Sequence, residues 1–462
     1  MSEHLHRQAL SALDSDVSGV LHTTDELRSI LGERCLIERY LEVETALATA
    51  QADLGLIPRE AAVAIAKVTV DDLDFTRLAD QMTIVGYPVV GLIQQIVEVV
   101  PNDLGQWAHW GATTQDIMDT ALVLQIREAL SEIMVDLALL VRALARLAAK
   151  YRDTPMAGRS QMQQAVPTTF GYRVAGWLSP LLRHMERLAQ LRQRVEAVQF
   201  GGAVGTIASI APDGLAVRKA MAEILELSDP LITWHSGRDR IVEVVAWSAQ
   251  VSSSISKIGH DVALSAQTEL GELAEARIAG GGTSSTMPQK RNPILSQQLM
   301  RASRLTRSYL DLALDGAMAD HDRATAAWAL EWNSVAPSIA VAGGAIDAAL
   351  RLIEGLEVNT AAMQENLGKT GGAIMAEAVM MSLARELGRQ VAHDKVADMV
   401  QTVATTGSTF DEVVRDQAPH AVDALDPKNY LGHAGEQVDE VIAEAGRVID
   451  MVADIGELGD HS

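Results

Sequence analysis

The chain has 462 residues, of which 48% are hydrophobic and 21% charged, and its net charge is −23. This composition is typical of a globular protein, and because basic residues are spread among acidic ones, neither a disordered chain nor a nucleic-acid-binding surface is expected. The length exceeds one ordinary compact core, so several packed subdomains or one long helical body with lobes are expected.

The N-terminal segment and the single cysteine indicate in which cellular compartment the protein is expected. The first residues, MSEHLHRQALSALDSD, have no basic start followed by an apolar core, and no apolar run reaches the roughly 18 to 20 residues that span a bilayer. Cys35 alone cannot form an intrachain disulfide or a thiolate metal cluster, and its apolar helical context favours a small core residue over a nucleophile. We therefore expect a cytoplasmic protein that does not span a membrane.

Long helices are expected through the middle of the chain. Residues 117–151 contain neither Gly nor Pro, and their apolar positions recur every three or four residues around more than one face. Such a helix is buried on several sides, as in a bundle shared between subunits. The segments from about Asp239 to Ile278 and from Pro293 to Asp315 have the same pattern. Strand signals are weak, since aromatic residues make up only 4% of the chain.

Segments rich in Gly, Pro, Ser, Thr and amide residues interrupt these helices and are expected to be loops or helix ends. They lie at 86–91, 105–116, 158–171, 199–206 and 280–293. Boundaries near residues 112 and 360 then give an N-terminal helical lobe (1–112), a central long-helix bundle that contains the loop 280–293 (113–360) and a C-terminal helical lobe (361–462). The predicted fold is all-α, with three helical domains around the central bundle.

The segment HWGATTQDIMDTA opens the long helix near residue 117. Thr113, Thr114 and Asp116 are residue types that cap helix N-termini, where free N–H groups and a partial positive charge favour an anion. Capping alone explains one such residue, and a helix N-terminus of this kind offers free N–H groups to an anion. For His109, close by in sequence, a structural role and a functional role both stay open.

The segment GGGTSSTMPQKRNP, at 280–293, has the composition of a loop that closes over a ligand. Three glycines let the backbone move, while Pro288 and Pro293 fix its end and open the next helix. A plain linker has no need of a lysine and an asparagine two residues apart beside paired serines. A ligand-clamping loop is therefore expected.

The stretch SSTMPQKRNP closely resembles the signature loop of the fumarase/aspartase superfamily: two serines, any residue, Met-Pro, any residue, Lys, any residue, Asn-Pro. The resemblance implies that Ser284 is the catalytic serine and that Lys290 and Asn292 hold substrate carboxylates, with Ser285 and Met287 in the same substrate-binding loop. Lys290 and backbone N–H groups could stabilise the serine alkoxide, and loop closure would exclude the water that screens this attraction.

The segment HWGATTQD resembles the hydroxyl-rich carboxylate-binding loop of the same family, which implies substrate binding by Thr113, Thr114 and Gln115. The family architecture is a homotetramer around a central bundle of long helices, with each active site assembled from segments of three chains. The sequence has no HExxH spacing and no GxGxxG after a strand, so we expect no metal and no cofactor.

The segment GRSQMQQAVPTTFG resembles a family region but departs from it at two positions. Fumarases, argininosuccinate lyases and adenylosuccinate lyases have a histidine where this chain has Gln161. Many bacterial 3-carboxy-cis,cis-muconate cycloisomerases have one where it has Gln164. Glutamine donates a hydrogen bond to substrate but cannot act as a general acid. A leaving or attacking group that is already a weak base, such as a carboxylate or nitrite, is therefore favoured.

Further segments resemble the 3-carboxymuconate cycloisomerase branch, and the resemblance runs from about Leu21 to Leu431. These segments are VQFGGAVGT, WHSGRDRIVE, SAQTELGELAE, HDRATAAWALEW and LDPKNYLG. The resemblance implies that Arg323 binds a substrate carboxylate. Arg238 and Arg240 could bind substrate or pair with acidic residues, and His235 could be a replacement acid or a core histidine.

The sequence thus predicts a lyase or cycloisomerase that acts on a small di- or tricarboxylate by proton exchange next to a carboxylate. The main expectation is γ-lactone formation of the 3-carboxymuconate cycloisomerase kind. One alternative is a β-eliminating lyase that releases fumarate or a relative from a succinyl compound such as nitrosuccinate or adenylosuccinate. A second is an inactive helical scaffold.

Overall fold

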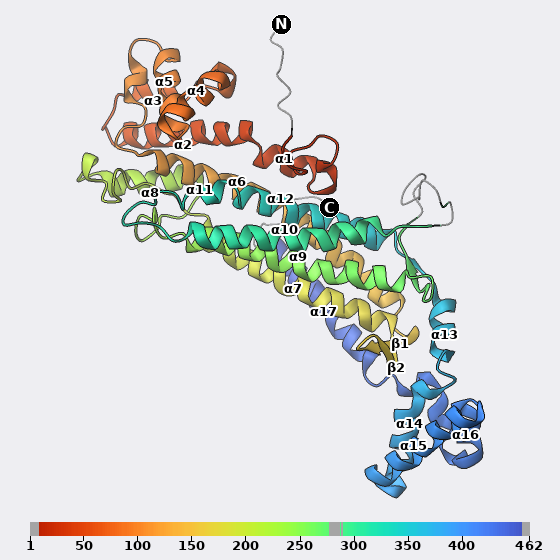
Figure 1. Ribbon diagram of the computed structural model, residues 1–462. Coiled ribbons are helices and arrows are strands. Elements are labelled where there is room, and N and C mark those ends of the chain that lie inside the picture. Colours follow the sequence, from red (N-terminus) through yellow and green to blue (C-terminus); the bar gives the residue numbers. More distant parts are fainter. Residues whose placement is uncertain (1–8, 277–286, 288–289, 455–462) are drawn as a thin grey trace.

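The computed structural model describes residues 9–276, 287 and 290–454, and it is an elongated bundle of long helices with smaller helical lobes at its ends (Figure 1). The central bundle consists of α6 (Thr114–Lys150), α7 (Phe170–Val195), α9 (Asp239–Ser265), α10 (Ile294–Gly316), α12 (Val335–Glu354) and α17 (Ala434–Asp454). Helix α9 packs on α10 and α7, and α6 packs on α7 and α12. The predicted all-α fold is confirmed.

Two further groups of helices extend from the bundle. The first group is α1 (Asp25–Leu31), α2 (Glu33–Asp53), α3 (Arg59–Ile65), α4 (Phe75–Val85) and α5 (Val89–Val99), and the second is α13 (Thr360–Gly368), α14 (Ala376–Leu387), α15 (Arg389–Thr406) and α16 (Phe410–Gln417). Two further helices, α8 (Gly214–Leu225) and α11 (Ala329–Trp332), lie at the α2 end of the bundle (Figure 1). The last helix, α17, returns from the second group to pack on α7 and α6. The domain boundaries near 112 and 360 stay a prediction.

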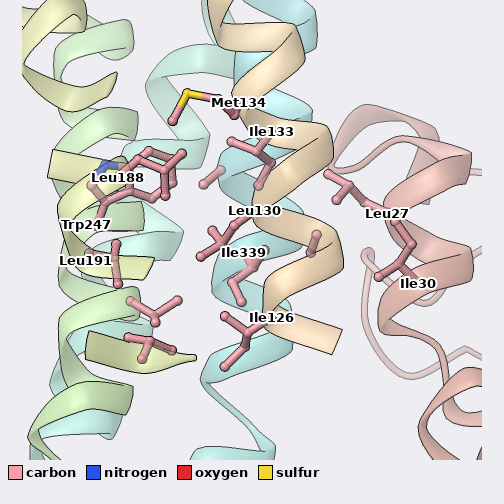
Figure 2. Packing of buried hydrophobic residues seen from close by; sticks show 14 of the residues in the cluster. Leu27, Ile30, Ile126, Leu130, Ile133, Met134, Leu188, Leu191, Trp247 and Ile339 are labelled. Carbon is pink, nitrogen blue, oxygen red and sulfur yellow. The ribbon is translucent and has the colours of Figure 1, made fainter. Parts of the chain in front are cut away.

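Helix α6 is the longest described element, and its 37 residues match the stretch that the sequence predicts. Its apolar side chains are buried on several faces at once: Ile126, Leu130, Ile133 and Met134 are fully buried, against α1 on one side and the other bundle helices on the other (Figure 2). Truncating one such side chain to alanine would cost about 2 to 5 kcal/mol of folding free energy.

The structure differs from the sequence prediction at the end of α9. The helical pattern extends to about Ile278, but α9 ends at Ser265, and Gly271 adopts a left-handed φ of 58° in the turn that follows. The chain then forms the two-residue strand β3 (Leu273–Ala274), which pairs antiparallel with β4 (Glu357–Val358). The helix therefore ends at Ser265 despite the apolar periodicity beyond it.

A second difference is the segment 158–171, which is predicted as a loop. Most of it belongs to an antiparallel hairpin of β1 (Pro155–Ser160) and β2 (Gln163–Thr169). The two residues of its turn, Gln161 and Met162, have φ values of 50° and 64°. Two-residue turns with positive φ favour Asn and Gly, so this pair carries no hairpin signal in the sequence.

The run Ala329–Glu354 is long and apolar enough to cross a membrane by length and composition, although 72% of its most apolar window is buried inside the protein. This run contradicts the expectation from the sequence that no apolar stretch is long enough to span a bilayer. It contains Gly343 and Gly344. Both glycines lie in tight contact with the chain near residues 22–27. The position of this run is that of a core helix.

Candidate active site

The predicted site residues fall into two groups, one at each end of the bundle. Thr113, Thr114, Gln115 and Arg323 lie at the N-terminal end of α6, next to the loop that follows α10. The remaining described residues, Gln161, Gln164, Met287, Lys290 and Asn292, lie at the other end, around the hairpin and the start of α10. Ser284 and Ser285 lie outside the described residues.

Thr113 is the N-cap residue of α6 and has extended backbone angles. Its N–H donates to Asp116 Oδ2 at 3.0 Å, as in a capping box, and its hydroxyl oxygen accepts a hydrogen bond of 2.9 Å from Arg323 Nη1. The Arg323 Nη2 group donates to the carbonyl of Ala203 at 3.0 Å. The guanidinium forms no ion pair with a carboxylate in the described part of the chain, so it places an uncompensated positive charge beside a helix N-terminus.

Asp116 connects three segments that are far apart in the sequence. Besides the Thr113 N–H, its buried carboxylate accepts hydrogen bonds of 2.9 Å from the N–H groups of both Gly201 and Gly202, and it lies 2.7 Å from His235 Nε2. The sequence alone predicts only a capping role for Asp116. We call Thr113, Asp116, Gly201, Gly202, His235 and Arg323 the Thr113 cluster.

Three side-chain atoms in or beside this cluster are buried without a hydrogen-bond partner among the described residues: Gln115 Oε1, His235 Nδ1 and Arg323 Nε. The Gln115 amide also donates to the His235 carbonyl at 2.9 Å, which fixes it in the interior. Buried polar atoms normally have partners, so their concentration at one helix end is typical of a place where water or a polar ligand binds.

Three other candidates have structural partners. His109 Nδ1 lies 2.6 Å from Glu44 Oε1; burial lowers the pKa of His109, but the Glu44 carboxylate outweighs this effect and raises it overall. Arg238 is buried and pairs with Asp119 and Glu331. The Arg240 guanidinium lies 4.8 Å from the centre of the Trp234 ring, and burial lowers the pKa of Arg240.

At the opposite end of the bundle, Glu272 holds the hairpin in place. Its fully buried carboxylate accepts two hydrogen bonds from Arg159 on β1, of 2.6 and 2.9 Å, and one of 2.7 Å from Asn366 Nδ2 on α13. The Asn366 carbonyl accepts a hydrogen bond of 2.7 Å from Gln164 Nε2. Gln161 is exposed at the turn. We call Arg159, Gln164, Glu272 and Asn366 the Glu272 cluster. Glu272 lies in the segment SAQTELGELAE, but the sequence predicts no role for it.

The described last residues of the signature segment, 290–293, lie at the same end of the bundle. Glu275 accepts hydrogen bonds from the N–H groups of Leu295 and Ser296, at 3.0 and 2.8 Å, and so caps the free N-terminus of α10. Arg291 donates to the Glu275 carbonyl and pairs with Glu357 on β4 at 2.9 Å. Lys290 is exposed and Asn292 half-buried, so both lie at the surface of a firmly anchored helix start.

The two groups are too far apart to act on one small molecule within one chain. Helix α10, of 23 residues, separates Asn292 from Arg323 and is about 35 Å long, and α6 separates Thr113 from the hairpin by about 55 Å. Both helices run along the bundle axis (Figure 1). A site that uses both groups therefore needs more than one copy of the chain.

Comparisons with known proteins identify relatives along most of the chain. A family model described as Lyase matches residues 19–304, and one described as Adenylosuccinate lyase C-terminus matches residues 372–441. The chain is 38% identical to Trans-aconitate decarboxylase 1 of Mycosarcoma maydis, covering 93% of this chain and 90% of that protein. It is 36% identical to the 3-carboxy-cis,cis-muconate cycloisomerase of Acinetobacter baylyi, covering 91% and 96%.

A solved structure is similar over the same extent. The 3-carboxy-cis,cis-muconate lactonizing enzyme of Pseudomonas putida superposes with a TM-score of 0.89 at 34% identity, covering 94% of this chain and all of that one.

Proposed function

The chain belongs to the fumarase/aspartase superfamily of lyases, and we propose that it is an intramolecular lyase that closes a γ-lactone on an unsaturated tricarboxylate. The observation that carries this proposal is the nearly full-length match to 3-carboxy-cis,cis-muconate cycloisomerase. The substrate named for the decarboxylase relative, trans-aconitate, is also an unsaturated tricarboxylate, which supports the same substrate class.

The proposed reaction is an isomerisation and needs no second reactant. A substrate carboxylate oxygen adds to the conjugated double bond and forms the ring C–O bond. The π electrons move to the carbon next to another carboxylate, which passes through an aci-carboxylate before that carbon takes a proton from the Ser284 hydroxyl. The resulting Ser284 alkoxide then regains a proton from solvent. In the reverse direction the Ser284 alkoxide removes the same proton, and Lys290 stabilises the alkoxide.

The remaining predicted residues hold the carboxylates in this proposal. Thr113, Thr114 and Arg323 offer two hydroxyls and a guanidinium at the N-terminus of α6. Asn292 adds an amide donor from the signature loop, with Ser285 and Met287 beside it. The amide groups of Gln115, Gln161 and Gln164 hydrogen-bond to the substrate in this proposal and orient it, but they transfer no proton.

We also propose that the active enzyme is a homotetramer whose sites combine the two ends of different chains. The separation of about 35 Å along α10 supports this assembly, because no small carboxylate reaches from Asn292 to Arg323 of the same chain. The three-domain division, a cytoplasmic location and catalysis without a cofactor belong to the same proposal.

Decarboxylation is a second candidate, and the similarity to a trans-aconitate decarboxylase favours it. Loss of CO₂ from a substrate carboxylate leaves an electron pair on carbon, which conjugation with a neighbouring carboxylate stabilises and which a proton then quenches. Neither this reaction nor lactonisation protonates a leaving group. Glutamines at positions 161 and 164 are compatible with both.

A substrate screen tests the proposal and separates the two candidates. The purified protein would be incubated with 3-carboxymuconate, trans-aconitate, adenylosuccinate, argininosuccinate and nitrosuccinate, with conjugated absorbance and released CO₂ measured in parallel. Loss of the muconate absorbance without CO₂, absent in Ser284→Ala, is the expected result. CO₂ release from trans-aconitate would favour the second candidate. Cleavage of adenylosuccinate or argininosuccinate alone would refute both.

A further inference from the structure

Arg323 lies in a segment that cannot position itself. The segment joins α10 to α11, and α11 has only four residues, too few to form a stable helix without tertiary contacts. A turn within the segment closes on Asp320, whose carboxylate accepts hydrogen bonds from the N–H and the hydroxyl of Thr325, and whose carbonyl accepts one of 3.1 Å from the Arg323 N–H. Two alanines then lead to Trp328, so the place of Arg323 depends on what holds α11.

A buried network fixes α11 to α6. Glu331 on α11 accepts hydrogen bonds from Arg238 Nε and Nη2, at 2.8 and 2.5 Å. The same guanidinium donates to both carboxylate oxygens of Asp119 on α6, at 2.7 and 2.9 Å, and all three side chains are buried. Asp119 lies six residues, about 9 Å, after Thr113, the residue that Arg323 contacts. This network therefore holds α11 beside the N-terminal end of α6.

Tyr87 makes a second contact with α11, from the short turn between α4 and α5. Trp328 is almost fully buried, and its ring stacks on the Tyr87 ring, with centroids 5.5 Å apart and 26° between the planes. The Trp332 ring meets Tyr87 edge-on at 6.1 Å and Trp328 at 5.7 Å. Stacked and edge-to-face pairs at these distances attract each other beyond the effect of burial. Tyr87 thus packs on the tryptophans at both ends of α11.

The turn that carries Tyr87 has a fixed shape. Gly86 ends α4 in a left-handed conformation, with a φ of 83°, and Pro88 is the N-cap residue of α5. Tyr87 lies between these two residues, so α4 and α5 together set the position of its ring. The side chain is half-buried, and it can therefore be replaced without opening the hydrophobic core.

We propose that Tyr87 is a positioning residue for Arg323. By packing on Trp328 and Trp332, it holds α11 and the turn at 320–325 where the Arg323 guanidinium meets the Thr113 hydroxyl. The inference rests on the proposed function, in which Arg323 binds a substrate carboxylate; Tyr87 acts through Trp328 and does not contact the substrate. All these contacts lie within one chain, so they do not depend on which surfaces the association of chains covers.

Tyr87→Ala and Tyr87→Phe in the full-length protein test the proposal, because only the first removes the ring. With the tricarboxylate that the wild type turns over, Tyr87→Ala should raise KM about three- to tenfold and leave kcat within about twofold. Tyr87→Phe should resemble the wild type in both, since the ring makes the contacts. A contribution of Tyr87 to stability alone would lower the unfolding temperature and leave KM unchanged, and that result would contradict the positioning role.

A combination of variants shows whether Tyr87 acts through Arg323. If it does, adding Tyr87→Ala to Arg323→Ala should change kcat/KM by less than about twofold, because the guanidinium that the ring positions is already gone. The same three- to tenfold loss in both backgrounds would overturn the proposal, since Tyr87 would then act by another route. An equal loss in Tyr87→Phe would also overturn it, because the hydroxyl would be the active group.

Hydrogen exchange gives a readout that needs no substrate. The N–H groups of Arg323, Thr325, Leu330 and Glu331 are hydrogen-bonded within this segment, and they should exchange at least about threefold faster in Tyr87→Ala than in the wild type or in Tyr87→Phe. Unchanged exchange would show that the ring does not hold the segment, and the proposal would fail. If the wild type turns over no tricarboxylate, the proposed function fails, and the exchange rates alone decide whether Tyr87 holds Arg323 in place.

Discussion

Mixing two inactive variants tests whether one active site combines residues of different chains. Ser284→Ala removes the proposed proton-transfer group, and its turnover should fall by a factor of about 10³ or more. Arg323→Ala removes a guanidinium at the opposite end of α10, about 35 Å away, and should lower kcat/KM by roughly 10- to 100-fold. Ser284→Ala alone is therefore expected to be nearly inactive, and Arg323→Ala alone to keep at most about a tenth of wild-type kcat/KM.

The expected gain follows from the number of intact sites. If Ser284 and Arg323 of one site come from different chains, a site is intact when its serine comes from the Arg323→Ala chain and its arginine from the Ser284→Ala chain. In randomly mixed tetramers with equal amounts of both, about a quarter of the sites meet this condition. If both residues come from one chain, no site does.

For the assay, the two variant chains are co-expressed with different affinity tags. Oligomers that contain both chains are then purified by using the two tags in succession, and their activity is compared with that of wild type. Activity near a quarter of wild type is expected. The matched control mixes the double variant Ser284→Ala/Arg323→Ala with wild type, and it should give about a quarter for shared sites but about a half for sites within one chain. A first mixture no more active than its parents, with a control near one half, would refute the shared site.

Three further predictions follow from single contacts. Gln161→His should raise a weak amine-eliminating side activity and leave lactonisation unimproved, since only the amine needs a proton; a gain in lactonisation would contradict this. Glu272→Gln should lower stability by about 3 kcal/mol and raise KM more than it lowers kcat, measured by thermal unfolding and steady-state kinetics, because it weakens the pair that positions the hairpin. Burial and the neighbouring carboxylates raise the pKa of Asp136 to about 6, so its ionisation costs stability as pH rises from about 4 to 6. Asp136→Asn should therefore increase the free energy of unfolding at pH 7 by up to about 3 kcal/mol, seen as a higher unfolding temperature. It should not do so at pH 4.

The long helices could be predicted because their apolar periodicity and their lack of helix breakers are visible in the local sequence. The stretch that forms α6 contains no helix breaker, and the apolar positions around several of its faces match a helix that contacts α1, α7 and α12 at once. The hairpin could not be predicted, since Gln161 and Met162 adopt positive φ values without being Gly or Asn. There, strand pairing and the contact between Arg159 and Glu272 override the local preference.

The residues of the candidate site could be named from the resemblance, but their arrangement could not. Thr113 and Arg323 are 210 positions apart and are joined by a single hydrogen bond. Asp116 contacts two glycines more than eighty positions away. Such contacts leave no periodic trace in the sequence, because each depends on where the intervening helices end. Only the capping role of Asp116, three residues after Thr113, is a local signal.

Shared sites require each end of the chain to be rigid by itself, and a buried carboxylate meets that requirement at both ends. A carboxylate accepts up to about four hydrogen bonds, so it can hold several segments together where a neutral amide oxygen accepts only two. Asp116 gathers donors from three segments, and Glu272 gathers Arg159 and Asn366. Gln164 contacts the Asn366 carbonyl and not the Glu272 carboxylate. A substitution at position 164 would therefore leave the hydrogen bonds of Glu272 to Arg159 and Asn366 in place, so the hairpin would stay anchored.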